Sequence, residues 1–240
     1  MSVTDPAARN ETDQAGADTP QNGKATLTDR AYRRLEELIV TLQLRPGEVL
    51  SESSLTKSLG IGRTPVREAL QRLALEGLIV ILPRRGILVS EINVSDQLEL
   101  LRVRREVEAV MARLAARRAT SAERTRLRRL ADAMDASAEQ NDDVEFMRLD
   151  RQYNVMLAEV CRNPFARKTM GLMQGLSRRF WYQHYKETLD LPRCARLHAA
   201  CARAIADGDP DTAVEATNVL VDYIEDFTRA TLEHGASTHS

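Results

Sequence analysis

The chain is poor in cysteine and aromatic residues and has no long hydrophobic run. Its 240 residues include 3 cysteines and 1 tryptophan, and aromatic residues make up 4% of the sequence. Three cysteines do not form a disulfide framework, which disfavours a small disulfide-stapled secreted domain. The sequence shows neither an apolar run of membrane length nor the pattern of a signal or transit peptide. We therefore expect a cytoplasmic protein that does not enter a membrane.

Charge and length set further bounds. The formal net charge is −1, which disfavours a generalised binder of polyanions. A chain of this length supports one large or two modest domains. Residues 1–26 contain almost no large apolar side chains and predict a disordered tail, and residues 236–240 predict another.

The run from Gly62 to Leu70 is the most informative segment of the sequence. Val66, Leu70 and Leu73 recur at helical spacing and predict a buried stripe. Pro65 suits the first position of this helix, and Thr64 before it suits the cap. The sequence therefore predicts a helix that begins at this point and ends near Glu76–Gly77, where the glycine terminates it.

The polar side chains of this helix favour DNA recognition. Arg67 and Gln71 point away from the apolar stripe. Arg63 and Arg67 lie on either side of a helix N-terminus, which attracts phosphate through its free N–H groups and its dipole. Arginine is also the side chain that best reads guanine edges in the major groove. Such helix starts also occur in proteins that do not bind DNA. Whether this helix recognises DNA therefore has to be judged from the segments on either side of it.

The flanking segments predict a winged helix-turn-helix domain at residues 27–91. In chain order we expect a helix at 27–44, a short apolar turn at 49–52, a brief helix around Leu55 and Leu59, the recognition helix, and β-rich runs at 78–81 and 87–89. The two β-rich runs flank Pro83–Gly86, a hairpin with Arg84 and Arg85 at its tip. We expect these two arginines to contact phosphates while the helix reads bases.

The domain resembles the GntR family of bacterial transcription regulators. The resemblance is carried by Pro46–Glu52, Leu59–Leu70, Glu76–Leu78 and Arg85–Gly86. It implies that Arg63 and Arg67 contact bases and that Gly86, at the wing tip, enters the minor groove.

Two positions depart from the pattern of that family. Gly62 stands where the family usually has Ser or Thr, which removes a hydroxyl that could contact phosphate. Ser53 and Ser54 stand where the fatty-acid-responsive members carry an extra arginine. The second departure disfavours an operator like that of those members.

Residues 92–235 predict an all-α antiparallel bundle, so the fold class is mainly α. Apolar stripes with a 3.6-residue period predict six helices, at 95–118, 121–138, 142–160, 164–186, 190–207 and 210–234. The segment resembles the FadR C-terminal domain (FCD) subfamily of GntR regulators, with a six-helix arrangement like that of the VanR type. This resemblance rests on Arg104 and Glu108, Asp150–Asn154, Asn163–Pro164, His198, Ala204–Ile205, Gly208–Asp209 and Ala213.

Four polar residues of the bundle lie within or beside its apolar stripes. These are Arg104, Asp150, Asn154 and His198. Buried charges are costly unless they are paired or bound to a ligand. We therefore expect a ligand pocket in the bundle, and the alternative is an internal Arg104–Asp150 salt bridge beside a hydrogen-bonded core histidine.

The resemblance also raises the question of a metal. Many proteins of this domain class hold a divalent ion with one Asp and three His, of which Asp150 and His198 match two. Asn154 and Leu220 replace the other two histidines, and leucine cannot ligate a metal. We expect effector recognition without a metal. The alternative is a metal-dependent carboxylate sensor that holds zinc, nickel or manganese with Asp150, Asn154 and His198.

The segment 177–185 gathers the single tryptophan and two tyrosines beside a pair of arginines. Arg178, Trp181 and Tyr182 would suit an organic carboxylate through forked hydrogen bonds and ring stacking. The alternative is that these amphipathic aromatics fill a dimer seam.

Together these features predict a ligand-responsive DNA-binding regulator, most simply a repressor. We expect a homodimer on a palindromic operator of double-stranded DNA, and an effector that is a small organic or aromatic carboxylate. An enzyme would need a nucleophile with a nearby base or a complete metal centre, and neither is visible in the sequence. A constitutive DNA-binding protein is the other alternative, but it leaves the polar residues of the bundle unexplained.

Overall fold

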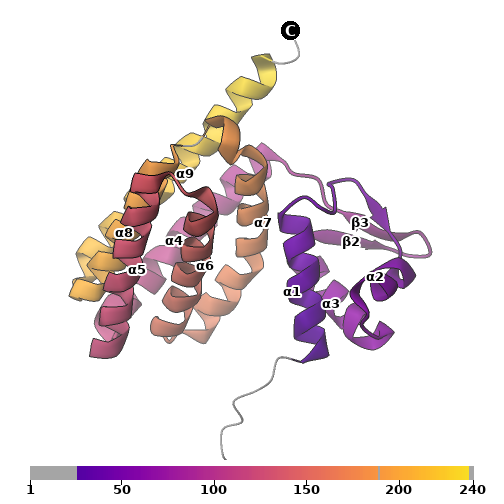
Figure 1. The fold of residues 1–240 in the computed structure, drawn as a ribbon, viewed down its shortest axis with the longest axis horizontal. Helices are drawn as coiled ribbons and strands as arrows, with labels where there is room; N and C mark the ends of the chain where they lie inside the picture. The colour runs from indigo at the N-terminus through magenta and orange to yellow at the C-terminus, as the bar shows by residue number, and fades with distance from the viewer. Residues whose placement is uncertain (1–25, 189, 238–240) are drawn as a thin grey trace, which may run out of the picture.

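The computed structural model describes residues 26–188 and 190–237. Within these residues the chain forms a small winged domain and a larger helical bundle, which lie side by side (Figure 1). The tails expected at 1–26 and 236–240 fall almost wholly outside the described residues. At their inner ends, Thr26 caps the first helix and the last helix extends to Ser237.

The winged domain consists of three helices and a three-stranded sheet. Its elements are α1 (Leu27–Val40), β1 (Val49–Leu50), α2 (Glu52–Leu59), α3 (Arg63–Leu75), β2 (Ile79–Leu82) and β3 (Gly86–Val89). The strands are antiparallel in the order β1-β3-β2. Apolar residues of the helices and of the inner sheet face form one core, to which Leu35, Ile39, Leu55, Val66, Leu70, Leu73, Ile79, Ile87 and Val89 contribute. The predicted winged helix-turn-helix is confirmed.

Two local predictions in the winged domain were wrong. The first helix ends at Val40 rather than Leu44, because the chain turns at Leu42, which adopts a φ of 58°. The segment expected as an apolar turn contains strand β1, in which Val49 pairs with Leu88. A two-residue strand is too short to show the alternation by which a strand is recognised.

The start of α3 also differs from the prediction. Gly62 is the N-cap and makes no side-chain cap hydrogen bond, so Thr64 and Pro65 occupy the second and third helical positions. Because all the N–H groups of the first turn lack partners within the helix, proline is tolerated at the third position as well. The first helical bond runs from the Val66 N–H to the Gly62 carbonyl, over 3.3 Å.

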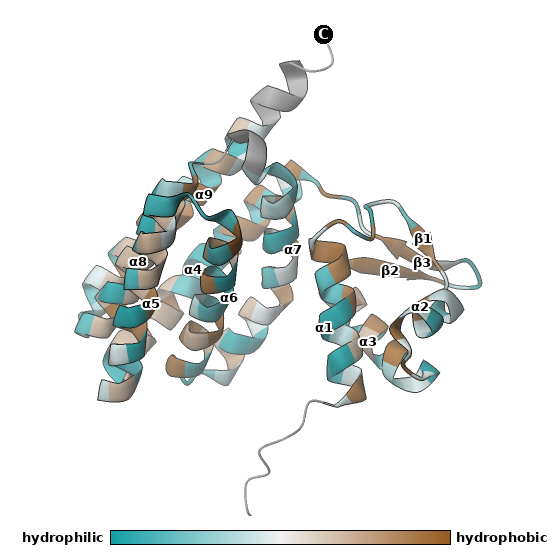
Figure 2. Cartoon of the chain, viewed as in Figure 1, coloured by the Kyte–Doolittle hydropathy of each residue, from teal (hydrophilic) through white to brown (hydrophobic). Residues whose placement is uncertain are grey.

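The bundle contains six helices within the described residues, as predicted. They are α4 (Val94–Arg118), α5 (Ser121–Gln140), α6 (Asp143–Val160), α7 (Pro164–Thr188), α8 (Leu191–Asp207) and α9 (Pro210–Ser237). Capping residues fix their starts, among them Asn93 and Thr120, and left-handed Asn141 and Gly208 end α5 and α8. Hydrophobic residues line the inner faces of the helices (Figure 2).

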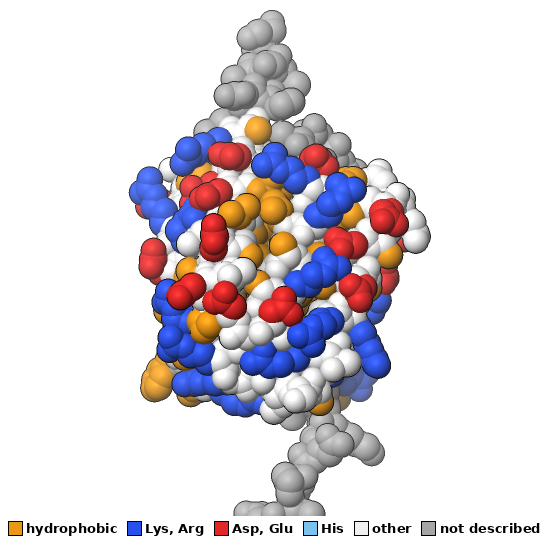
Figure 3. All heavy atoms as spheres, turned by 90° about the vertical axis from the view of Figure 1, so that its left-hand side faces the viewer, with side chains coloured by type: hydrophobic (Ala, Val, Ile, Leu, Met, Phe, Trp, Pro, Cys, Tyr) orange, Lys and Arg blue, Asp and Glu red, His pale blue; other side chains and the backbone are white. Residues whose placement is uncertain are grey.

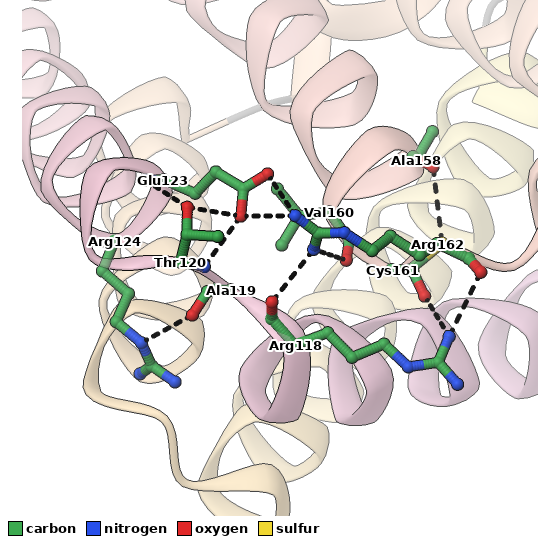
Figure 4. Close-up of polar contacts among 9 residues, drawn as sticks. All are labelled: Arg118, Ala119, Thr120, Glu123, Arg124, Ala158, Val160, Cys161 and Arg162. Atoms are coloured by element: carbon green, nitrogen blue, oxygen red, sulfur yellow. Dashed lines mark hydrogen bonds and ion pairs between the residues drawn. The ribbon is translucent and has the colours of Figure 1, made fainter.

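An arginine network closes one end of the bundle (Figure 4). Arg162 donates to both carboxylate oxygens of Glu123, at 2.8 and 2.9 Å, and to the carbonyl of Arg118. Arg118 in turn donates to the carbonyl of Cys161, and Arg124 donates to that of Ala119. The network satisfies carbonyl groups at the ends of α4 and α6, which the helices themselves leave free.

The surface of the bundle carries charges of both signs. Figure 3 shows the side that lies on the left in Figure 1, where basic and acidic side chains surround a hydrophobic patch. This mixture agrees with the formal net charge of −1. Among the described residues, no helix is both long and apolar enough to cross a membrane.

Candidate DNA-binding surface and ligand cavity

Helix α3 presents the side chains predicted to contact DNA to the solvent. Arg63, Thr64, Arg67 and Gln71 are all exposed, whereas Val66 on the same helix is fully buried. The apolar stripe of the sequence therefore fixes which face of α3 is open. The prediction that these residues contact DNA remains a prediction, and their exposure meets its first requirement.

Arg67 has an acidic partner that the sequence pattern did not reveal. Its Nε and Nη2 atoms donate to the two carboxylate oxygens of Glu52, at 3.1 and 2.9 Å. Glu52 is the first residue of α2, which packs against α3. The Glu52 hydrogen bond and charge raise the pKa of Arg67. The two-pronged contact orients the guanidinium on the exposed face.

The wing places its two arginines at the turn between β2 and β3. Arg84 and Arg85 are exposed, and Arg84 adopts a φ of 62°. Gly86 is partly buried and begins β3, with a φ of 112°. A Cβ atom at this position would lie 2.6 Å from the Leu50 carbonyl oxygen, so the pairing of β1 with β3 requires glycine. Backbone geometry explains this glycine, and its entry into the minor groove remains a prediction.

A cavity of about 70 Å³ lies inside the bundle. Its lining comes from five helices and consists of Gln97 and Arg104 of α4; Phe146, Met147, Asp150 and Asn154 of α6; Gln174, Ser177, Arg178, Phe180 and Trp181 of α7; Cys194 and His198 of α8; and Ile224 and Phe227 of α9. Six of the seven residues predicted to bind the effector are thus brought together. Tyr182 does not line the cavity, because it lies about 100° round the helix from Trp181.

His198 and Asp150 form the polar centre of the cavity wall. The His198 Nε2 atom lies 3.1 Å from the Asp150 Oδ1 atom, and its Nδ1–H donates to the Cys194 carbonyl at 2.9 Å. Burial opposes the charge of His198, but the Cys194 and Asp150 contacts outweigh it and raise the pKa of the imidazole well above its usual value. Burial also opposes the charge of Asp150, yet His198, Arg178 and Arg104 lower the pKa of its carboxyl. Both shifts favour the charged form of each member of the pair.

The other two polar residues of the bundle prediction are paired as well. The Asn154 amide donates to Asp150 Oδ1 at 2.9 Å. Arg104 pairs with Glu108, one helical turn along α4, and its Nε donates to Glu108 at 3.0 Å. The alternative of a direct Arg104–Asp150 salt bridge was wrong, because a carboxylate at i+4 on the same helix is nearer.

The polar groups do not fit the metal site that the resemblance suggested. The Asn154 amide turns an N–H toward Asp150, and the fourth position is Leu220. In the described part of the chain, no three His, Cys, Asp or Glu side chains are grouped so that they could hold an ion. His198 and Asp150 already satisfy each other by a direct contact.

Sequence reasoning missed several residues of the cavity. Gln97 and Ser177 are buried, and the Gln97 amide lies 3.5 Å from the Ser177 hydroxyl. Phe146 contacts the His198 ring edge-on at 5.3 Å between centroids. Gln97 lies seven residues before Arg104 on the same face of α4, so this helical spacing could have revealed it. Phe146 is apolar, so its side chain carries no polar signal that would mark it as part of a ligand site.

A winged helix-turn-helix joined to an α-helical bundle that contains a polar cavity defines a class of DNA-binding transcription regulators. Residues 27–89 match the family described as bacterial regulatory proteins, gntR family, and residues 99–223 match the FCD domain. The chain belongs to the gntR family of bacterial regulatory proteins and carries an FCD domain. The predicted resemblance is confirmed at this level, and the six-helix VanR type remains a prediction.

Curated relatives are regulators of the same kind. An HTH-type regulator from an unstable DNA locus of Streptomyces ambofaciens is 44% identical over 72 residues, 30% of each chain. The HTH-type regulator YdhC of Bacillus subtilis is 29% identical over 133 residues, 55% of this chain and 59% of YdhC. The HTH-type transcriptional repressor RspR of Escherichia coli K12 is 26% identical over 212 residues, 88% of this chain and 93% of RspR. The chain thus spans under two thirds of the first two relatives and most of the third.

The fold is also that of solved regulators. The structure of McbR/YncC of E. coli superimposes with a TM-score of 0.73 at 19% identity and covers 87% of this chain and all of the other. A GntR regulator from Rhodococcus sp. RHA1 gives a TM-score of 0.62 at 22% identity, over 85% of this chain and 97% of the other. Both likenesses show the shared fold.

Proposed function

We propose that this regulator is a repressor that binds a palindromic operator and dissociates from it when a small carboxylate binds in the bundle cavity. The observation that carries the proposal is the cavity wall, in which Arg104, Arg178 and His198 supply three cationic groups. The protein acts as a homodimer, because a two-fold protein matches a palindromic site with two major-groove contacts. As a regulator of chromosomal genes, it works in the bacterial cytoplasm.

The size and charge of the cavity favour a small acid over a large one. A volume of about 70 Å³ corresponds to a few water-sized groups. Arg104 and His198 are already paired with Glu108 and Asp150, and both cations are largely buried. Arg178 is 25% exposed and makes a single longer contact, so it is the cation most available to a ligand.

The ligand proposal is tested by calorimetric titration of the purified protein with acetate, malonate and benzoate. We expect the smaller acids to bind and Arg104→Gln to weaken that binding. The matched control is Arg102→Gln, because Arg102 is exposed on the same helix and pairs with Glu99. Equal binding by the parent and Arg104→Gln would remove Arg104 from the site.

The DNA-binding surface is tested by Arg67→Ala on an operator selected from a random duplex library. Loss of a base-reading arginine is expected to cost about 1–3 kcal/mol of binding free energy and to relax the base preference at one position. The control is Arg34→Ala, because Arg34 is exposed on α1 of the same domain and pairs with Glu37 at the surface. If Arg67→Ala bound the operator as tightly as the parent, Arg67 would not be a base-reading residue.

Effector recognition is proposed to need no metal. The support is the direct contact between His198 and Asp150, together with Leu220 at the fourth position. Elemental mass spectrometry of the untagged protein tests this. Close to one equivalent of zinc, nickel or manganese per chain would contradict it and restore the metal-dependent alternative.

A further inference from the structure

Helix α7 is a wall shared by the ligand cavity and the winged domain. Its residues Gln174, Ser177 and Trp181 line the cavity. On its other side, Leu176 packs against the core of the winged domain, and Gly175 lies against Leu78. Figure 1 shows α7 as the bundle helix beside α1. A ligand that binds on the cavity side of α7 therefore lies only one helix diameter from the winged domain on the other side.

Arg178 belongs to both sides of this wall. It lines the cavity, and its charge lowers the pKa of the Asp150 carboxyl across it. Its Nη1 atom also donates to Glu36 Oε1 of α1, at 3.2 Å. The Glu36 side chain is 12% exposed, so it has little water to replace this partner.

Glu36 lies at a junction where charge balance matters. Glu76, at the end of α3, has a raised pKa because it is partly buried and because the Glu36 charge is near. The Tyr32 hydroxyl of α1 donates to Glu76 at 2.8 Å, and the Arg72 guanidinium of α3 lies 4.0 Å from the Tyr32 ring centre. Arg178 thus offsets one of two neighbouring carboxylates where α1 packs on the recognition helix.

Arg179, the next residue, fixes α7 to the segment that joins the domains. It is 2% exposed and donates to the carbonyls of Ser90 and Glu91, at 2.8 and 3.1 Å. With Leu176 and Gly175 it holds α7 in place whether or not Arg178 is paired. Arg178 is therefore the contact that can change while the rest of the wall stays in place.

We propose that Arg178 is the switch residue. When the effector binds, Arg178 leaves Glu36 and pairs with the effector carboxylate, and the winged domain is then no longer coupled to the bundle through the Arg178–Glu36 ion pair. The proposal rests on the carboxylate-binding function proposed above. A guanidinium that turns to a ligand in the cavity no longer pairs with Glu36, so α1 loses the partly buried ion pair that joins it to α7 of the bundle. By linkage, a change that weakens the Arg178–Glu36 contact and leaves Arg178 free for the ligand should both favour ligand binding and disfavour operator binding.

The test is Glu36→Gln, which keeps the shape of the side chain and removes its charge. The matched control is Glu37→Gln, because Glu37 is the next residue of α1 and pairs with Arg34 at the surface. With malonate as the probe, we expect Glu36→Gln to bind roughly five- to tenfold more tightly than the parent and to bind the selected operator more weakly by a similar factor. Hydrogen exchange in α1, which loses its ion pair with α7, should become faster without ligand. Glu37→Gln should match the parent in all three measurements.

The outcomes separate the two proposals. If malonate binds neither protein, the proposed ligand class fails, and operator affinity and hydrogen exchange still decide the coupling. If Glu36→Gln matches the parent in operator affinity and exchange, Arg178–Glu36 is not the switch, even where malonate binds. Arg178→Gln serves as a second variant: it should loosen the same junction but lose malonate binding, whereas a merely structural ion pair would leave malonate affinity unchanged in both variants.

Discussion

Single arginines carry much of the chemistry of this regulator, and each depends on an acidic partner. Arg67 is held by Glu52, Arg104 by Glu108 and Arg178 by Glu36. The settings differ, because the Arg67 side chain is 64% exposed whereas that of Arg104 is 12% exposed. An exposed pair adds little to folding, so the Glu52 contact is best understood as positioning of Arg67 for its target.

Glu52→Gln tests this positioning. We expect the free energy of unfolding to change by less than about 1 kcal/mol, since the pair is exposed. Operator affinity should fall relative to affinity for random duplex, because the guanidinium is no longer oriented, whereas the loss of a negative charge near the phosphates strengthens binding to both duplexes. Fluorescence anisotropy with both duplexes measures the ratio. An unchanged ratio would mean that Glu52 does not orient Arg67 on DNA.

The exposed residues were easier to predict than their partners. Arg63, Arg67 and Gln71 follow from the apolar stripe on one helix, which fixes the open face. Glu36 lies 142 residues from Arg178 in the sequence, and no local pattern links two such positions. Glu108 was within reach, because it stands four residues after Arg104 on the same helix.

At the scale of elements, the bundle helices are joined by side chains that satisfy free backbone groups. Glu123 caps α5 by accepting from the Thr120 N–H at 2.8 Å and also receives Arg162. Although partial burial works against it, the Arg162 and Thr120 contacts lower the pKa of the Glu123 carboxyl from its usual 4.5. A lowered pKa in the folded state means that this stabilisation is present above about pH 4.5 and is lost as the pH falls through the folded value.

Glu123→Gln should therefore destabilise the protein only when the carboxylate is charged. Glutamine can still cap the helix, so the expected loss is about 1 kcal/mol near pH 7, shrinking toward zero below pH 4.5. Urea unfolding between pH 7 and pH 3.5 measures the difference from the parent. Glu139→Gln, an exposed site on the same helix, is the control. A difference that stayed constant with pH would show that the charge of Glu123 is not what stabilises this end.

Element boundaries were predictable where the sequence carries a stop signal. The α7 and α9 starts at Pro164 and Pro210 match the prediction, and α8 ends before Gly208 as expected. The end of α1 was missed, because Leu42 turns the chain without a glycine or proline at that position. Strand β1 was missed because its two residues form a strand only by pairing with β3, which lies far along the chain.

At the scale of the whole molecule, the contact between the domains depends on a glycine. A Cβ atom at Gly175 would lie 2.8 Å from Leu78 Cδ1, and Leu78 is fully buried. Gly171, one turn earlier on α7, has no atom within 4 Å of such a Cβ atom. The two positions share a helix and differ in whether the winged domain lies against them.

Alanine substitutions at Gly171 and Gly175 can be compared directly, with Gly171 as the control. Gly171→Ala should raise the free energy of unfolding by about 0.5–1 kcal/mol, because alanine costs less backbone entropy in a helix. Gly175→Ala should gain nothing or lose stability, since the new methyl group has to push Leu78 aside. Chemical denaturation of both variants measures this. Equal stabilisation by the two substitutions would show that α7 is not tightly seated on the winged domain.

Because α7 is a wall of both the cavity and the winged domain, the boundary between the two halves in space differs from their boundary along the chain. Along the chain, the two halves meet at residues 90–93, and a designer who wanted a biosensor for another compound would cut there. In space, the winged half also includes the outer face of α7, because Leu176 packs in its core and Arg179 donates to the carbonyls of Ser90 and Glu91, just after strand β3. A chimera that takes a foreign sensing half should therefore keep Gly175, Leu176 and Arg179 of this chain. Without them, the transplanted sensor would bind its compound and leave transcription unchanged.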